Sequence, residues 1–207
     1  MTPNLFLAFV IAFATIYLTV LRYTPFRGDF ILKALPIWCL AGYVALKGDG
    51  AAATLTVIGL LFSSGGDIAL ALDRKRYFVV GLSLFLIAHL FYLAAFSQGI
   101  TTVTLNIWGG LILLFSLILG SWLFPALGKL RGPVLLYMVV ITAMGVAAAI
   151  HPLAFPNLLF GAFLFILSDS LIAIDKFRHP IPYAHYLIMF TYYIGQLGIA
   201  LAMGQGY

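Results

Sequence analysis

The sequence carries very little charge. Only 8% of its 207 residues are Asp, Glu, Lys or Arg, whereas a soluble domain has about 25%. Glutamate is missing, and the acidic residues are six aspartates. Hydrophobic residues make up 64% of the chain, and the mean hydropathy is +1.13. Most of such a surface cannot face water, so we expect an integral membrane protein and not the one or two soluble domains that the length allows.

Other absences exclude whole classes of chemistry. With Cys39 as its single cysteine, the chain can form no internal disulfide, and this residue is interpreted as a structural thiol. There is no CxxC, HExxH, Walker or GxSxG motif, and the histidines lack the tight spacing of helical metal sites. We therefore expect neither a metal nor a cofactor. Residues 1–3 carry no basic residue, so the first apolar run is expected to be a retained helix and not a cleaved leader.

Long apolar runs dominate what remains. A membrane helix needs about 20 largely apolar residues. Breaks at Gly, Pro and charged residues delimit eight candidate helices, at 4–21, 30–47, 52–72, 77–97, 104–124, 132–150, 155–175 and 182–203. The loops between them are short, so neighbouring helices are expected to be antiparallel. We expect an all-α, polytopic membrane protein with one transmembrane domain, residues 1–207.

Basic residues fall on one side of this pattern. Ten of the eleven Lys and Arg lie on or beside odd-numbered loops: Arg22, Arg27, Lys33, Arg74, Lys75, Arg76, Lys129, Arg131, Lys176 and Arg178. Lys47 alone lies on the other side. The positive-inside rule then places the odd loops in the cytoplasm and both termini outside, in a multi-pass protein of the cell (inner) membrane. The net charge of +5 is spread over short loops, which indicates topology and not binding to nucleic acid.

The two halves of the chain resemble each other weakly. Asp67 and Asp73 enclose five mostly apolar residues before a basic stretch, and Asp169 and Asp175 do the same 102 positions later. The pairs Arg27-Gly28 and Arg131-Gly132 are 104 apart. Residues 1–102 and 103–207 are therefore predicted to be parallel four-helix pseudo-repeats around a two-fold axis along the membrane normal, with a site near their interface.

Asp67 and Asp169 are the main candidates for that site. Each lies six residues before a charged helix end, which places it about 9 Å inside the membrane. An Asp at mid-membrane costs roughly 2.5–3.5 kcal/mol, less near an interface, so a function is a good reason to keep both. The alternative is that each snorkels to the surface or pairs with Lys or Arg.

Further polar residues occur inside the spans. His89 and Tyr92 are three apart and share a helix face, while His185, Met189, Tyr192 and Gln196 form a helical stripe with Tyr193 beside it. Two roles are open for each: a hydrogen bond to a neighbouring helix, or the lining of a pocket. Ser63, Ser64 and Ser168 can bond their own helix carbonyls, although Ser168 adjoins Asp169. Lys33 is either a snorkelling interface anchor or a ligand for a phosphate.

At these residues the sequence resembles the YhhN family of membrane proteins, the lysoplasmalogenase family. The similarity rests on Gly66-Asp67-Ile-Ala-Leu70, on Gly81, Phe85, His89 and Tyr92 at spacings of four, four and three, on Gly161-Ala162, Phe165, Ser168-Asp169 and Ile172-Ala173, and on Tyr193-Ile-Gly-Gln196. These blocks keep the family's order over residues 62–200. Residues 1–60 match mainly in hydropathy, and Lys33-Ala34 stands where the family often has Lys-Pro.

The resemblance implies eight helices and hydrolysis of the vinyl ether bond of lysoplasmalogens, which releases a fatty aldehyde and glycerophosphocholine or glycerophosphoethanolamine. It implies that Asp67 and Asp169 are catalytic. This chemistry needs a carboxylic acid that donates a proton and a carboxylate that stabilises the cation or activates water. Two carboxylates at one depth in a low dielectric do not both ionise easily, so the pair is expected to hold one proton. Which one holds it is left open.

The remaining site residues are predicted to bind the substrate: Lys33, Ser64, His89, Tyr92, Ser168, His185, Tyr192, Tyr193 and Gln196. The expected partners are a lysophospholipid in the bilayer, membrane lipids and a possible second copy in a homodimer. The alternative function is a proton- or cation-coupled transporter that uses the buried Asp pair. A scaffold in which the aspartates only hold helices together is a third interpretation.

Overall fold

The computed structural model describes residues 2–73, 76–152 and 156–205. Arg74 and Lys75 of the predicted basic loop, and residue 155 at the start of the seventh predicted span, lie outside them. Within these ranges the chain forms eight α-helices and no strand. The helices are α1 (Pro3–Val20), α2 (Asp29–Lys47), α3 (Gly50–Leu72), α4 (Phe78–Phe96), α5 (Ile107–Leu123), α6 (Arg131–Ile150), α7 (Pro156–Phe177) and α8 (Ala184–Met203).

All eight helices are long and apolar enough to cross a membrane, so the predicted all-helical, eight-span fold is confirmed. Their ends lie within a few residues of the sequence prediction, because the Gly, Pro and charged residues used to delimit the spans also lie at the helix ends. Pro3 and Pro156 open α1 and α7, where a proline costs no helical hydrogen bond. Gly28, with φ +89°, precedes α2 in a left-handed conformation that a side chain would strain.

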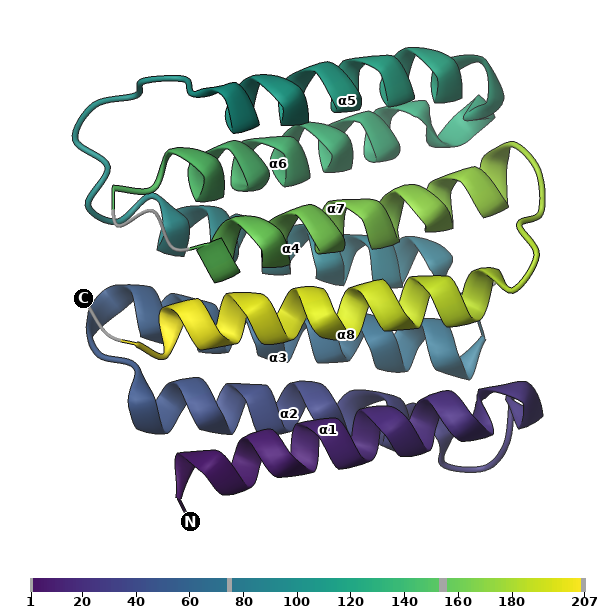
Figure 1. The fold of residues 1–207 in the computed structure, drawn as a ribbon. Coiled ribbons are helices and arrows are strands. Elements are labelled where there is room, and N and C mark those ends of the chain that lie inside the picture. Colours follow the sequence, from purple (N-terminus) through teal and green to yellow (C-terminus); the bar gives the residue numbers. More distant parts are fainter. Residues whose placement is uncertain (1, 74–75, 153–155, 206–207) are drawn as a thin grey trace.

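The helices form one bundle with two distinct ends. Figure 1 places α5 at one edge of the bundle and α1 toward the other, and both chain termini lie at the same end. Because successive helices alternate in direction, the connections α1–α2, α3–α4, α5–α6 and α7–α8 lie at the opposite end. This end carries the basic residues, apart from Lys33 and Lys47, within the residues described. We call it the basic end; its side of the membrane stays a prediction.

Contacts between the halves follow a reciprocal pattern. Helix α4 of the first half packs on α6 of the second, and α8 of the second half packs on α2 of the first. Exchanging the halves converts one contact into the other, as a two-fold relation requires. The parallel repeat itself stays a prediction.

Close packing of α7 on α8 fixes the backbone that carries Asp169. A Cβ at Gly161 would lie 2.7 Å from the Gly195 carbonyl oxygen, and one at Gly198 would lie 2.8 Å from the Asn157 carbonyl oxygen. Small residues let two membrane helices approach this closely. One face of α7 is thereby held against α8.

Candidate active site

Asp67, on α3, is buried with both carboxylate oxygens occupied. Its side chain is 2% exposed, with the Lys33 ammonium of α2 at 3.1 Å from Oδ1. The Tyr192 hydroxyl of α8 donates a hydrogen bond of 2.6 Å to Oδ2. Asp67 therefore joins three helices through an ion pair and a hydrogen bond, which is the pairing with Lys considered from sequence.

Lys33 lies inside the bundle and not at the membrane surface. Its residue is buried, and the Tyr193 hydroxyl donates to its backbone carbonyl at 2.9 Å. Pro36 lies in the same stretch of α2 and has no N–H for the helix ladder. Of the two roles considered for Lys33, an anchor at the membrane surface is therefore wrong, because its ammonium is paired with the buried Asp67 carboxylate.

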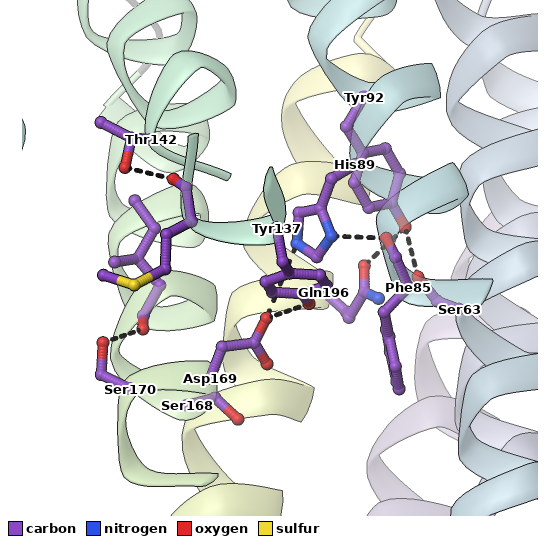
Figure 2. A network of polar contacts seen from close by, with 12 residues as sticks. Ser63, Phe85, His89, Tyr92, Tyr137, Thr142, Ser168, Asp169, Ser170 and Gln196 are labelled. Atoms are coloured by element: carbon purple, nitrogen blue, oxygen red, sulfur yellow. Dashed lines mark hydrogen bonds and ion pairs between the residues drawn. The ribbon is translucent and has the colours of Figure 1, made fainter. Parts of the chain in front are cut away.

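Asp169, on α7, has a phenol and an imidazole beside it. The Tyr137 hydroxyl of α6 donates to Oδ2 at 2.5 Å, and His89 Nε2 of α4 lies 3.8 Å from the same oxygen. Figure 2 shows both contacts converging on the carboxylate. Among the described residues no Lys or Arg forms an ion pair with Asp169.

The hydrogen bond to Phe85 fixes the tautomer of the neutral His89 ring. His89 Nδ1 is 2.5 Å from the Phe85 carbonyl oxygen, which can only accept, so this nitrogen carries the hydrogen. In the neutral ring Nε2 then has a free lone pair, and within the described chain it has no hydrogen-bond partner. The fully buried ring packs on Phe165 and Tyr137, with ring centres 4.7 and 5.2 Å away. In its neutral form the ring therefore presents an acceptor toward Asp169.

The two acidic clusters correspond under exchange of the halves. Lys33 and Tyr137 are 104 positions apart, Asp67 and Asp169 are 102 apart, and His89 and Tyr192 are 103 apart. In each cluster the Asp is contacted by the second helix of its own half and the fourth helix of the other. The arrangement of helices around each Asp is the same in both clusters. The chemical groups differ, because the Lys33 ammonium beside Asp67 corresponds to the Tyr137 phenol beside Asp169.

A chain of packed aromatic rings links the partners of the two carboxylates. The Tyr192 ring is 5.3 Å from the ring of Phe165, which in turn packs on His89, and Phe85 packs on both Tyr192 and Phe165. No hydrogen bond joins Asp67 to Asp169 in the part of the chain that the structure describes. The two carboxylates are therefore not in direct hydrogen-bond contact, and the expectation that the pair holds one proton stays a prediction.

A third polar group lies deeper in the bundle. The Tyr92 hydroxyl donates to Gln196 Oε1 at 2.8 Å and lies 3.5 Å from Ser63 Oγ (Figure 2). Gln196 Nε2 is buried and unpartnered among the described residues. Tyr92 and Gln196 thus connect α4 to α8, the last helices of the two halves, and belong to the same polar interior as the aspartates.

The other predicted residues are spread more widely. Ser64 accepts a hydrogen bond from the Trp38 indole at 3.0 Å, and Ser168 donates to the Ile188 carbonyl oxygen at 3.0 Å, so both tie neighbouring helices together. His185 is exposed at the start of α8, in a surface hollow beside Arg22. The stripe predicted on α8 is therefore buried only from Met189 onward.

Two residues of the candidate site were not predicted from the sequence. Tyr137 bonds Asp169, and Phe165 fills the space between the clusters. Phe165 occurs in the family motif without a role. Tyr137 had one available signal, since it lies at the repeat offset from Lys33.

Asp169 borders a cavity that does not reach Asp67. The cavity has a volume of about 70 Å³ and lies between α3, α4, α5, α6 and α7. Its lining includes Asp169, Tyr137 and Phe85 and is otherwise mostly aliphatic. Within the described residues no group of three or more His, Cys, Asp or Glu side chains is placed to hold a metal ion. A carboxyl group in an apolar hollow of this kind is suited to proton transfer to an apolar substrate.

These features define a multi-pass membrane protein with an acidic site buried among its spans. Residues 28–203 match the model of the YhhN family. The chain belongs to this family.

Curated relatives carry an enzyme name. The chain is 37% identical to lysoplasmalogenase TMEM86A of Bos taurus, over 86% of this chain and 79% of that protein. It is 36% identical to lysoplasmalogenase TMEM86B of Homo sapiens, over 83% and 74%. No solved structure matches the chain.

Proposed function

We propose that this protein hydrolyses the vinyl ether bond of lysoplasmalogens within the membrane, releasing a fatty aldehyde and glycerophosphocholine or glycerophosphoethanolamine. The observation that carries the proposal is Asp169, a carboxyl group at the wall of an apolar intramembrane cavity, in a chain similar to curated lysoplasmalogenases. Because those relatives are named as enzymes, hydrolysis is favoured over coupled transport.

The reaction needs a proton donor and a water molecule. Protonation of the vinyl carbon remote from the ether oxygen gives an oxocarbenium ion. Water adds to its carbon and loses a proton, and the resulting hemiacetal breaks its C–O bond to give the aldehyde and the glycerol hydroxyl. One carboxyl group can donate the first proton and take one back from the water, as the acid of a retaining glycosidase does.

Asp169 is the proposed acid and the residue that touches the substrate. Asp67 has a cation at 3.1 Å, which favours its ionised form. Asp169 has no such cation beside it among the described residues, and a phenol donates to its Oδ2, so its protonated form is the proposed proton donor. Tyr137 and His89 act as positioning residues that orient this carboxyl group.

Asp67 is proposed to act through Tyr192. The ion pair with Lys33 holds the carboxylate in place, the carboxylate holds the Tyr192 hydroxyl, and the Tyr192 ring supports Phe165 against His89. Tyr92, Tyr193, Gln196, Ser64 and Ser168 complete this supporting interior. The basic end is proposed to face the cytoplasm of the cell membrane and to attract the phosphate, and a homodimer stays a prediction.

Purified protein in detergent, given a lysoplasmalogen, tests the proposal. Wild type is expected to release aldehyde, and Asp169→Asn is expected to lower kcat about 100-fold or more, as loss of a general acid does. Asp49→Asn is the matched control, because this exposed aspartate at the start of α3 forms no capping hydrogen bond. A folded wild-type protein that releases no aldehyde at any pH would sink the proposal.

A further inference from the structure

Helix α5 is bordered by two large apolar hollows. Its only buried residues are Gly109, Ile112 and Leu123, so it is loosely embedded. A groove of about 980 Å³ lies between α5 and α6, and a hollow of about 840 Å³ lies on the side of α5 that faces α7. The cavity at Asp169, with about 70 Å³, is far too small for an alkyl chain, so a long-chain substrate needs one of these spaces.

The groove between α5 and α6 meets the Asp169 cavity. Ser116, Met138 and Thr142 line both spaces. The Thr142 hydroxyl lies 2.8 Å from Ser116 Oγ and 2.6 Å from the Met138 carbonyl oxygen, and Figure 2 shows Thr142 on α6 above Asp169. The junction is thus formed by two small hydroxyl side chains and one flexible thioether, which can move aside for a chain.

The groove also has the direction that a lysolipid requires, with one end at the basic end of the bundle. It runs from Phe124 and Leu135 at the basic end to Val103 and Ile150 at the other. From Thr142 to Ile150 α6 rises about 12 Å beyond the junction. At the basic end the Arg131 guanidinium lies over the Phe124 ring, 4.8 Å from its centre, so a cation stands where the groove begins.

The hollow facing α7 lacks this continuity. It meets the cavity only at Phe115 and Ile166 and otherwise extends toward Asn106 and Pro156, at the end opposite the basic residues. A lipid whose phosphate lies at the basic end cannot follow it from headgroup to chain end. The α5–α6 groove is the space that passes from the basic end alongside the acid.

We propose that the groove between α5 and α6 binds the alkenyl chain of the lysophospholipid substrate, with the vinyl ether at Asp169 and the phosphate near Arg131. This inference rests on the proposed function. It adds a binding site that selects substrates by the length of the alkenyl chain. Side chains beyond the junction then set how long a chain fits, whereas the chemistry at Asp169 is the same for all chains.

Chain-length kinetics test the groove. Ala143 lines it one residue beyond Thr142, so Ala143→Phe is expected to lower kcat/KM about tenfold for a long alkenyl chain through steric overlap, and to leave a short-chain lysoplasmalogen unaffected. Val146→Phe places the same block nearly one turn further along the groove, so its cut-off is expected at longer chains. Gly110→Phe is the control, because a side chain there meets open space and lines no hollow.

A binding experiment separates failure of this inference from failure of the proposed function. A saturated alkyl-ether lysophospholipid with a photoreactive group in its chain cannot be hydrolysed as a vinyl ether, so labelling does not depend on turnover. Adducts are expected on α5 and α6 residues of the groove, and excess unlabelled lysophospholipid is expected to suppress them. Adducts on the α7 side of α5, suppression by any diacyl phospholipid, or equal losses for short and long chains in Ala143→Phe would overturn the proposal.

Discussion

At the scale of single residues, the two aspartates share a position but not a chemical environment. Asp67 lies against the Lys33 ammonium and Asp169 against the Tyr137 phenol, although the two partners occupy corresponding places in the two halves. A buried cation is the difference between them. The Lys33 ammonium favours the ionised form of Asp67, whereas no such cation lies beside Asp169 among the described residues.

The Lys33–Asp67 pair should be sensitive to loss of one partner and tolerant of loss of both charges. Lys33→Met is expected to cost about 3–5 kcal/mol of stability, because it leaves a carboxylate buried without its cation. The double variant Lys33→Met/Asp67→Asn is expected to regain most of that stability, since an amide oxygen can still accept from Tyr192. Thermal unfolding in detergent measures both, with Lys47→Met, at an exposed lysine of the same helix, as control.

Activity of the same variants tests the role of Asp67. If Asp67 acts through Tyr192, the double variant recovers aldehyde release relative to Lys33→Met. A double variant that is as stable as wild type and still inactive would show that the Asp67 carboxylate itself takes part in the reaction.

At the scale of helices, the α7–α8 contact determines where Asp169 stands. Gly161→Val should separate the two helices, because its Cβ would meet the Gly195 carbonyl oxygen and the Ile199 nitrogen at 2.7 Å. Backbone atoms cannot rotate away as a side chain does, so we expect a loss of at least 1–3 kcal/mol. Gly110→Val in α5 is the matched control, with nothing near its Cβ. Equal unfolding temperatures for the two variants would contradict the packing argument.

The sequence predicts the positions of the helices well, but it predicts poorly which helices and side chains contact one another. Membrane spans follow from hydropathy and from Gly, Pro and charge at their ends, so α1 to α8 were predictable to within a few residues. Contacts between side chains depend on how each helix is rotated and on which helices are neighbours, such as α4 and α6. A helix that is apolar on all sides has no hydrophobic periodicity from which either could be predicted. That is why His89 was identified as a site candidate while Tyr137, its neighbour at Asp169, was missed.

At the scale of the whole molecule, charge is distributed along one axis. The connections at the basic end hold Arg22, Arg27, Arg76, Lys129 and Arg178 among the described residues, whereas the opposite end holds Lys47. In the proposed binding mode, with the phosphate at the basic end, the vinyl ether lies near the depth of Asp169, about 9 Å along α7 from Asp175. The orientation of the bundle therefore decides which leaflet supplies the substrate.

Cysteine labelling in intact cells tests that orientation. With Cys39→Ala as background, a membrane-impermeant maleimide is expected to label Thr101→Cys, in the α4–α5 connection, from outside the cell. It is expected to label Pro180→Cys, between α7 and α8, only after the membrane is opened. Both positions are exposed to solvent in the structure, so a difference between them reports the side of the membrane and not burial. The reverse pattern would place the basic end outside, and the substrate would then have to come from the outer leaflet, because Asp169 lies in the half of the bundle nearer that end.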